Sequence, residues 1–384
     1  MNSFDVIVLG VGGMGSAACY ELARRGRRVL GLEQFPHVHA RGSSHGHTRI
    51  IRTAYAEHPA YVPLVRRAFD RWYELEQITG RHLLTECRCL NVGPPGSEIV
   101  GGVRSSVREH HLSAIQLNGD EINRLFPAFR FPSEFVGILE DAAGFLYVEE
   151  CVRAYIDAAR SLGAEIHAEE AVREWRPSGG GVEAKTEKGT YYAAKLVVTA
   201  GAWATRLLAD IGVPLAVMRQ TLLWFDVGLR AADFRRGKFP VFIADTPDGP
   251  FYGLPAIDLR GLKLARHYNA TELPHPDGVN WEITDADVAA MRPLIDRYIP
   301  GLGALTEGQV CMYTLTPDRH FVIDLHPAQP QIAVACGFSG HGFKFASVVG
   351  EVLADLVERG STRHDIAMLS AKRFTGEPQA PARA

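Results

Sequence analysis

The sequence predicts two interleaved domains: an α/β dinucleotide-binding domain of the Rossmann type, and an α+β domain built on an antiparallel sheet. Three observations predict this organisation. The chain has 384 residues, more than one compact core usually organises. It opens with a strand, a glycine-rich loop, a helix and a second strand, and buried apolar strands return near residues 195 and 331. In between, residues 218–270 alternate apolar and polar side chains, as antiparallel strands do.

Five segments make up the two expected domains, because nucleotide-type signals return after each stretch of antiparallel character. The nucleotide domain is expected to take residues 1–81, 146–215 and 306–375, and the substrate domain residues 82–145 and 216–305. The Pro- and Ala-rich end, residues 376–384, is expected to be disordered.

Composition and charge restrict the class of protein. The hydrophobic fraction is 46%, the charged fraction 22% and the net charge −3, which is ordinary for a globular protein and argues against a nucleic-acid partner or an anionic membrane. No apolar run reaches the ~18 residues that a membrane-spanning helix needs. The six cysteines are scattered and form no disulfide framework, so we expect a protein of the reducing cytoplasm.

The first element is a buried strand, Val6–Leu9, followed directly by a glycine-rich loop. Gly10, Gly12 and Gly15 fit G-x-G-x-x-G. The first glycine allows a tight turn from strand to helix, the second lets a pyrophosphate approach the backbone, and the third lets helix and strand pack closely. The loop is therefore expected to bind a dinucleotide.

A helix and a second strand, which ends in an acid at Glu33, complete this unit. The helix N-terminus, with Gly13 and Met14, offers free N–H groups and the positive end of its dipole to the phosphates. Glu33 is placed to accept hydrogen bonds from a ribose. The order of these parts favours a dinucleotide site over a structural glycine turn, but it does not separate NAD from FAD.

The next elements follow from periodicity and turn signals. Residues 34–52 form a polar loop rich in His and Gly, of a length typical of functional loops. An amphipathic helix over 60–79 ends at Gly80, which suits a left-handed C-cap. Short strands are expected over 82–145 and a helix over 151–162.

The rest of the chain adds seven expected elements. They are a hairpin over 181–192, a buried strand over 195–201, hairpins that turn at Asp248-Gly249 and Arg260-Gly261, a helix whose capping box is Thr284 and Asp287, a strand over 331–335, and a closing helix over 343–356. The strand over 195–201 ends at a glycine, which again suits the edge of a nucleotide-binding sheet.

A first cluster of candidate functional residues, His45, Arg49 and Arg52, lies in the loop after Glu33. Two arginines three apart line one face if the segment is helical, and the arginine fork suits a carboxylate or a phosphate. Surface salt bridging is the common role of such a pair. The position of the loop after the ribose-binding strand favours a functional role.

A second cluster is the loop Gly337–Lys344, whose glycines open the closing helix. A helix N-terminus suits an anion, or the negative charge of a reduced flavin. Lys344 lies in the first helical turn, where a cation opposes the dipole, which indicates a role toward a ligand. The alternative is a surface lysine whose stem packs on apolar groups.

Lys263 and His267 share one face of an expected strand, because strand residues two apart point the same way. That face either lines a cleft, where the pair would polarise a substrate or oxygen, or is an ordinary solvated face. Cys311 stands alone, and a lone cysteine is usually a small buried hydrophobe. No metal site is expected, because H-E-x-x-H and paired C-x-x-C motifs are lacking, and no G-x-S-x-G indicates a serine hydrolase.

Four segments carry a resemblance to one family: Gly42–Arg52, Val310–Thr314, His320–Asp324 and Gly337–Phe345. Together they are similar to the monomeric sarcosine oxidase family, whose relatives include N-methyl-tryptophan oxidase and pipecolate oxidase. The resemblance follows the family in order over nearly the whole chain. It implies a monomeric, cytoplasmic, FAD-dependent amine oxidase that acts on CH–NH bonds with oxygen as acceptor.

The resemblance also implies roles for individual residues. FAD would be joined through its 8α-methyl group to Cys311 as a thioether, and Arg52 and Lys344 would bind the substrate carboxylate. Lys263 would hold a water near flavin N5 and activate oxygen. The residues implied in catalysis are Lys263, Arg49, His45, His267 and Tyr252, of which Tyr252 and His267 would also shape the substrate cavity. Those implied in cofactor binding are Gly10, Gly12, Gly13, Met14, Gly15, Glu33, Arg41, Ser43, Ser44, Arg49, Val172, Gly201, Cys311, Gly340, Gly342 and Lys344.

The implied reaction is the demethylation of sarcosine or a similar N-methyl amino acid. A hydride would pass from the neutral amine to FAD, the imine would hydrolyse to formaldehyde and glycine, and oxygen would give hydrogen peroxide. The alternative within the same fold is a bulkier or cyclic secondary amino acid, such as N-methyl-tryptophan, pipecolate or proline. Alternatives from other classes are an NAD-dependent dehydrogenase and a non-catalytic nucleotide-binding protein.

Two places depart from the family pattern. The chain has Ser44-His45-Gly46-His47 where many members have His-His-Gly-Asp, so the first and last positions of that segment differ. Arg266 stands beside His267 where a small or aromatic residue is common. Both departures bear on the choice of substrate more than on the reaction.

Overall fold

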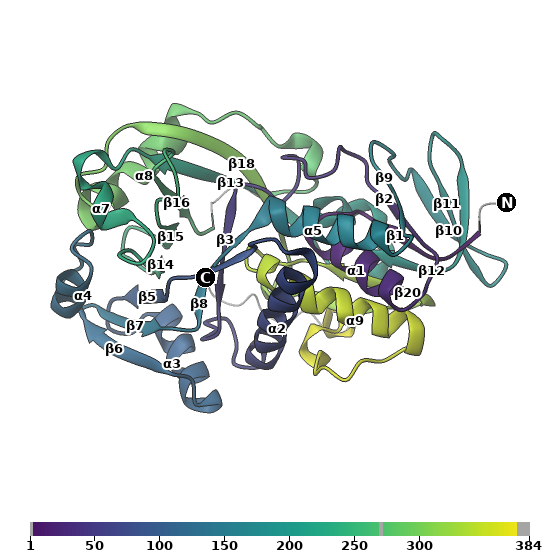
Figure 1. Ribbon diagram of the computed structural model, residues 1–384, viewed down its shortest axis with the longest axis horizontal. Helices are drawn as coiled ribbons and strands as arrows, with labels where there is room; N and C mark the ends of the chain where they lie inside the picture. Colours follow the sequence, from purple (N-terminus) through teal and green to yellow (C-terminus); the bar gives the residue numbers. More distant parts are fainter. Residues whose placement is uncertain (1–2, 269–271, 375–384) are drawn as a thin grey trace.

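The computed structural model describes residues 3–268 and 272–374, so the tail 376–384, for which disorder is expected, lies outside the described residues. Two large sheets lie toward opposite ends of the long axis, and a small sheet lies between them (Figure 1). Within the described ranges, no helix is long and apolar enough to cross a membrane.

The first sheet has eight strands within the described ranges. They are β1 (Ser3–Leu9), β2 (Val29–Leu32), β9 (Glu165–His167), β10 (Glu174–Ser178), β11 (Gly181–Lys185), β12 (Thr190–Val198), β19 (Val322–His326) and β20 (Gln329–Cys336). Strand β1 pairs in parallel with β2 and β12, and β12 pairs in parallel with β20. The carboxyl ends of these strands therefore meet at one edge, as in nucleotide-binding folds.

Four long helices pack together beside this sheet: α1 (Gly13–Arg24), α2 (Tyr61–Thr79), α5 (Val148–Ser161) and α9 (Ala346–Arg359). Helix α1 lies between α5 and α9 (Figure 1). Helix α2 ends at Gly80 with φ 66°, which confirms the predicted left-handed cap.

Two helix boundaries differ from the expectation. Helix α5 begins at Val148 rather than at residue 151, because two acidic residues in its first turn suit the positive end of the helix dipole. The closing helix begins with a 3₁₀ turn over Phe343–Phe345 before α9 starts.

The second sheet contains nine strands within the described ranges. They are β5 (Cys89–Gly93), β6 (Ala114–Asn118), β7 (Val136–Glu140), β13 (Ala216–Phe225), β14 (Val241–Ala244), β15 (Phe251–Leu254), β16 (Leu262–Arg266), β17 (Glu272–Leu273) and β18 (Leu305–Leu315). All pairs are antiparallel except β14 with β5. The sequence therefore predicts the antiparallel character correctly and misses one parallel pair.

Turn and cap signals of the second domain are confirmed. The hairpins β14–β15 and β15–β16 turn at Asp248-Gly249 and Arg260-Gly261. Thr284 and Asp287 form a capping box at the start of α8. The helices around this sheet and the short helix after β12 are α3 (Glu98–His110), α4 (Gly119–Leu125), α6 (Ala204–Leu207), α7 (Ala231–Phe234) and α8 (Asp285–Tyr298).

A small sheet of β3 (Thr48–Arg52), β8 (Ala143–Tyr147) and β4 (Leu84–Glu86) lies between the two large ones (Figure 1). Strand β18 pairs with β13 of the second sheet, whereas β19 and β20, which follow it, belong to the first. The chain thus crosses between the sheets after residue 315. The expected domain division, with its last boundary at residue 306, stays a prediction.

We predict that a methyl group at Gly350 destabilises the crossing of α9 over α1. A Cβ there would lie 2.6 Å from the backbone carbon of Ala17, so Gly350→Ala should cost about 1–3 kcal/mol through overpacking. Gly101, inside α3, has no atom within 4 Å of its added Cβ, and Gly101→Ala should stabilise by about 0.5–1 kcal/mol. Thermal unfolding midpoints of the two variants should move in opposite directions; midpoints that both rise would contradict the crossing.

Candidate cofactor and substrate site

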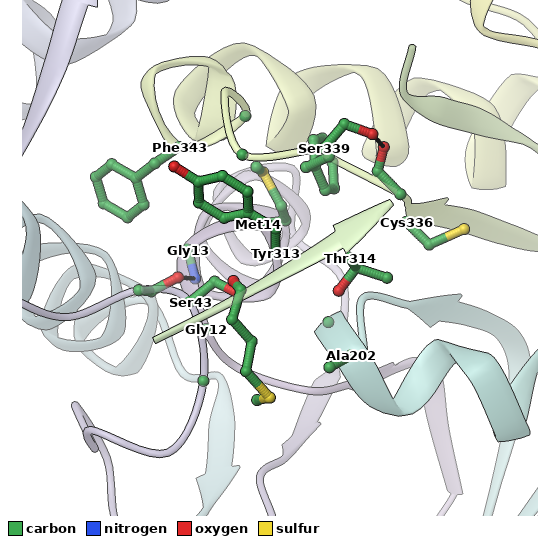
Figure 2. A pocket seen from close by; sticks show the side chains of 18 of the residues that line it. Gly12, Gly13, Met14, Ser43, Ala202, Tyr313, Thr314, Cys336, Ser339 and Phe343 are labelled. Carbon is green, nitrogen blue, oxygen red and sulfur yellow. Dashed lines mark hydrogen bonds between the residues drawn. The ribbon is translucent and has the colours of Figure 1, made fainter. Parts of the chain in front are cut away.

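A cavity of about 1410 Å³ is lined by residues of both large sheets. This volume exceeds the roughly 300–1,000 Å³ of ordinary small-molecule pockets, so it has room for a cofactor together with a substrate. Figure 2 shows part of its lining, where Gly12, Ser43, Tyr313 and Phe343 surround the same space.

The glycine loop has the geometry that the motif predicts. Gly10 has φ 86°, and a Cβ there would lie 2.6 Å from the Thr199 carbonyl oxygen. A Cβ on Gly15 would lie 1.8 Å from the Gly10 carbonyl oxygen, so only glycine allows the close approach of helix and strand. The backbone N–H of Gly13 donates to Ser44 Oγ, 3.1 Å away, which ties the 42–47 loop to the start of α1.

Helix α1 has Gly12, which has no side chain, at its N-cap, and the N–H of its first residue, Gly13, donates to Ser44 Oγ. Gly12, Gly13 and Met14 line the cavity, so the positive end of α1 faces it. This is the arrangement that an anionic pyrophosphate needs. The residues present therefore fit a dinucleotide.

Glu33 lies at the end of β2, is buried and lines the cavity. Its Oε2 accepts from the Val11 N–H at 2.9 Å, and its Oε1 accepts from the Phe35 N–H at 3.1 Å. Each oxygen keeps a lone pair, so the predicted ribose contact stays open to it. Val172 and Gly201 also line the cavity.

Of the other predicted cofactor residues, some line the cavity and some do not. Ser43, Ser44, Gly340 and Gly342 line the cavity. A Cβ on Gly340 would lie 2.3 Å from the Tyr313 ring, which explains the glycine. Gly15 and Arg41 are not among the lining residues, and the Arg41 guanidinium instead lies 5.3 Å from the Trp281 ring centroid.

Cys311 lies on β18, is 1% exposed and lines the cavity. Burial raises the pKa of its thiol, while the positive charges of Arg49 and Lys263 act in the opposite direction. Arg49 also lines the cavity, and its guanidinium donates to the carbonyls of Thr48 and Ser43.

Arg49 and Arg52 lie on strand β3, so the helical condition for a shared face is not met. In a strand, residues three apart point to opposite faces. Both arginines nevertheless line the cavity, because β3 lies between the two large sheets.

Arg52 and Lys344 lie close enough for each charge to affect the other. The buried Arg52 guanidinium donates to Glu57 Oε2 at 2.8 Å and to the Ala54 carbonyl at 2.8 Å. Lys344 Nζ donates to the His341 carbonyl at 2.6 Å. Because Lys344 is only 5% exposed, the surface-lysine alternative is wrong.

Burial and the charge of Arg52 lower the pKa of Lys344 to about 7. Burial raises the cost of charging Glu57, but Arg52 outweighs it and holds the pKa of Glu57 well below its usual value. The Arg52–Lys344 pair thus consists of one permanent cation with a carboxylate partner, and a second cation that titrates near neutrality.

Tyr252, His267 and Tyr313 form an aromatic wall of the cavity. Tyr313 Oη lies 3.4 Å from His267 Nδ1. Burial lowers the pKa of His267 to about 4, so its imidazole is neutral at pH 7. Tyr252 and His267 both line the cavity, and their role toward a substrate stays a prediction.

Lys263 and His45 are buried but are not among the lining residues. Lys263 Nζ donates to the carbonyls of Gly46 at 2.6 Å and Thr48 at 2.7 Å, which makes the solvated-face alternative wrong. Burial, together with the charge of Arg49, lowers the pKa of Lys263 well below its usual value. Burial also lowers the pKa of His45 to about 4, and its Nδ1 lies 3.1 Å from Gln309 Oε1.

The two departures from the family pattern have different surroundings. His47 contacts Arg260 and Glu307, at 2.8 and 3.2 Å from its Nε2, and is not a lining residue of the cavity. The Arg266 guanidinium donates to the carbonyls of Ala290 and Asp248 and is not a lining residue either. Ser44 does line the cavity.

Sequence reasoning missed four residues that the site uses. Thr48 holds Lys263, Glu57 pairs with Arg52, and Tyr55 lies under the Arg52 guanidinium at 4.6 Å from its ring centroid. The fourth, Tyr313, belongs to a motif already noted, and its place beside Cys311 on β18 was the available signal.

The parallel sheet, the helix N-terminus that faces a large cavity and the buried cations define a dinucleotide-dependent enzyme with a site for a small anion. Residues 5–356 match the family model described as FAD dependent oxidoreductase. The chain belongs to this FAD-dependent oxidoreductase family and, within it, to the monomeric sarcosine oxidases and their relatives. It is an FAD-dependent amine oxidase, which excludes the NAD-dependent and the non-catalytic alternatives.

Two curated relatives and one solved structure carry this comparison. The chain is 42% identical to monomeric sarcosine oxidase of Streptomyces avermitilis, over 98% of this chain and 99% of the relative. It is 34% identical to N-methyl-L-tryptophan oxidase of Yersinia pestis, over 97% and 99%. The structure of NikD, an amino acid oxidase of nikkomycin biosynthesis, superposes with a TM-score of 0.85 at 24% identity, over 96% and 97%, which shows the shared fold.

We predict that small carboxylates bind more weakly as the pH rises. Lys344 is protonated below its pKa of about 7 and neutral above it, so one of two cations is lost on the alkaline side. The Kd of butyrate, which stays ionised throughout, should rise by up to about tenfold per pH unit above that point. Isothermal titration of the FAD-bound protein measures this.

Lys344→Met should bind butyrate weakly at every pH, and Lys238→Met, which alters an exposed lysine, should retain the wild-type profile. A wild-type Kd that does not change with pH would contradict the assignment.

Proposed function

We propose that the protein oxidises sarcosine or a similar N-methyl amino acid. The imine product hydrolyses to formaldehyde and glycine, and oxygen is the electron acceptor and gives hydrogen peroxide. The observation that carries the proposal is the Arg52–Lys344 pair in the same cavity as the aromatic wall of Tyr252, His267 and Tyr313. Two cations at one end suit the carboxylate of an amino acid, and the wall suits an uncharged amine with its methyl group.

Arg52 and Lys344 are proposed to bind and orient the substrate carboxylate. In the structure Arg52 Nη2 donates to both oxygens of Glu57, at 3.1 and 2.8 Å, so a substrate carboxylate has to compete with Glu57 for this guanidinium. The chemistry that FAD supplies when bound is acceptance of a hydride, followed by transfer of the electrons to an acceptor. A carboxylate held at two points limits the poses of the carbon that gives up the hydride.

The amine has to be neutral, because only a free lone pair allows loss of a hydride from the neighbouring carbon. Arg52 and Lys344 favour the neutral amine, since nearby positive charge lowers the pKa of an ammonium group. His267 adds no charge, because its pKa is lowered to about 4. Tyr252 and His267 are proposed to exclude water from the amine and its methyl group.

Lys263 is proposed to serve the reaction with oxygen. Its Nζ is buried, and the carbonyls of Gly46 and Thr48 hold it in one place. An ammonium group fixed in a water-excluded site stabilises negative charge that develops nearby. Arg49, whose guanidinium lines the cavity, adds a permanent positive charge there, although the same charge lowers the pKa of Lys263.

Cys311 is proposed to carry FAD as a thioether. The support is its position on the cavity wall, together with the charges of Arg49 and Lys263, which favour the thiolate against burial. We also propose a cytoplasmic monomer, which the six free cysteines and the names of the sarcosine oxidase relatives support.

The test of the proposed function is anaerobic bleaching of the bound flavin, followed by air. Sarcosine should bleach it faster than N-methyl-tryptophan, pipecolate or glycine, and air should restore the colour with one peroxide per cycle. Faster bleaching by a bulkier amine would support the same reaction but with that amine as the preferred substrate. Bleaching without recovery in air would contradict oxygen as the acceptor.

Cys311→Ser is predicted to leave FAD extractable by acid, because a hydroxyl oxygen is a poorer nucleophile than a thiolate at neutral pH. Cys336→Ser is the matched control, since Cys336 is equally buried and also lines the cavity. Acid precipitation followed by absorbance of the supernatant measures the released flavin. Covalent flavin in Cys311→Ser would place the attachment elsewhere.

A further inference from the structure

Strand β3 connects the two ends of the proposed chemistry. Thr48, its first residue, offers the carbonyl that holds Lys263, and Arg52, its last residue, is the proposed carboxylate-binding arginine. The position of β3 along its own axis therefore affects both Lys263 and Arg52.

Glu149 fixes the chain just before β3. It lies in the first turn of α5, and its Oε1 accepts from the backbone N–H groups of Gly46 at 2.8 Å and His47 at 3.1 Å. The Gly46 carbonyl is one of the two that hold Lys263. Burial opposes ionisation of this carboxyl, but the backbone N–H groups of His47 and Glu149 and the nearby positive charge of Arg49 outweigh burial and lower the pKa of Glu149.

Glu140 fixes the chain just after β3. It is the last residue of β7 and is 2% exposed, and its Oε2 accepts from the backbone N–H groups of Thr53 at 3.0 Å and Ala54 at 2.7 Å. The Ala54 carbonyl in turn accepts from Arg52 Nη1 at 2.8 Å. Glu140 thus holds the residue whose carbonyl accepts from the Arg52 guanidinium, while burial raises the pKa of the Glu140 carboxyl to about 7.

The two carboxylates stand in matching places around β8, the strand that pairs with β3. Thr48 pairs with Tyr147 and Arg52 pairs with Ala143, so the two strands run side by side over the whole of β3 (Figure 1). Glu140 precedes β8 and Glu149 follows it. Each end of β3 therefore meets one carboxylate, and each carboxylate accepts two consecutive N–H groups.

We propose that Glu140 and Glu149 are positioning residues, one for each half of the reaction. Glu140 positions Arg52 to bind the substrate carboxylate. Glu149 positions the carbonyls that hold Lys263, which serves the reaction with oxygen. This inference rests on the proposed function, because it takes the roles of Arg52 and Lys263 from there. It assigns the two glutamates separate effects, although both act on the same strand.

Two substitutions at each glutamate distinguish the effect of side-chain length from the effect of the negative charge. Glu→Asp keeps the negative charge but withdraws the carboxylate by one methylene group, so it can no longer accept both N–H groups at these distances. Glu→Gln keeps the reach and one carbonyl acceptor but removes the charge. If the glutamates act by geometry, the Gln variants stay close to the wild type and the Asp variants do not.

The first measurement is binding of butyrate, which has the shape of sarcosine with a methylene group in place of the amine. Glu140→Asp should raise its Kd by about tenfold or more, whereas Glu140→Gln should stay within about threefold of the wild type. Neither Glu149→Asp nor Glu149→Gln should change this Kd. A Glu140→Asp protein that binds butyrate like the wild type, or a Glu140→Gln protein as weak as Glu140→Asp, would overturn the role of Glu140.

The second measurement is recolouring of the flavin by air after bleaching with the preferred amine. Glu149→Asp should slow it by about tenfold or more, in the same direction as Lys263→Met, and the Glu140 variants should leave it unchanged. Amide hydrogen exchange gives a readout that does not depend on activity: Gly46 and His47 should exchange faster in Glu149→Asp, and Thr53 and Ala54 faster in Glu140→Asp. Exchange unchanged at these amides would overturn the inference.

Glu150 provides the matched control. It stands beside Glu149 in the first turn of α5, but it is exposed and pairs with Arg153. Glu150→Asp should change neither measurement. Arg52→Lys and Lys263→Met distinguish a failure of the proposed function from a failure of this inference alone. If these two variants leave butyrate binding and recolouring unchanged, the proposed function fails; if they act and the glutamate variants do not, only this inference fails.

Discussion

The site depends on the burial of positive charge around a single cavity. Arg52, Lys263 and Lys344 are each no more than 5% exposed, and a buried cation is stable only with partners. Arg52 has Glu57, whereas the two lysines donate to main-chain carbonyls. Carbonyl partners carry no charge to neutralise the lysines, and burial together with a neighbouring arginine lowers the pKa of each lysine.

Because the partners are main-chain carbonyls, the small sheet determines where the buried cations lie. A carbonyl holds a lysine in place only if its own peptide is fixed. The peptides that hold Lys263 lie at the start of β3, and the peptide that holds the Arg52 guanidinium lies just after it. Pairing between β3 and β8 makes these peptides rigid, so the positions of the cations depend on the backbone hydrogen bonds of the small sheet.

Local signals predicted the parts of the fold that depend on neighbours in the sequence. The glycine loop, the Gly80 cap and the capping box at Thr284 are of this kind, and all three are confirmed. Strand alternation showed which residues share a face with Lys263 but not which face is buried, because burial depends on a loop 217 positions away. Glu57, and the acceptors of main-chain N–H groups, leave no spacing pattern in the sequence. Arg49 and Arg52 would share a face only if their segment were helical, but pairing of β3 with β8, a non-local contact, makes it a strand.

The course of strand β18 has a mechanical consequence. β18 pairs with β13 of the second sheet over its length, and the chain then passes to β19 and β20 of the first. A cofactor bonded to Cys311 on β18 while its phosphates rest on the glycine loop would span the two sheets as a cross-link. Such a molecule would act as a structural brace as well as a reagent, and would restrict movement of one sheet relative to the other.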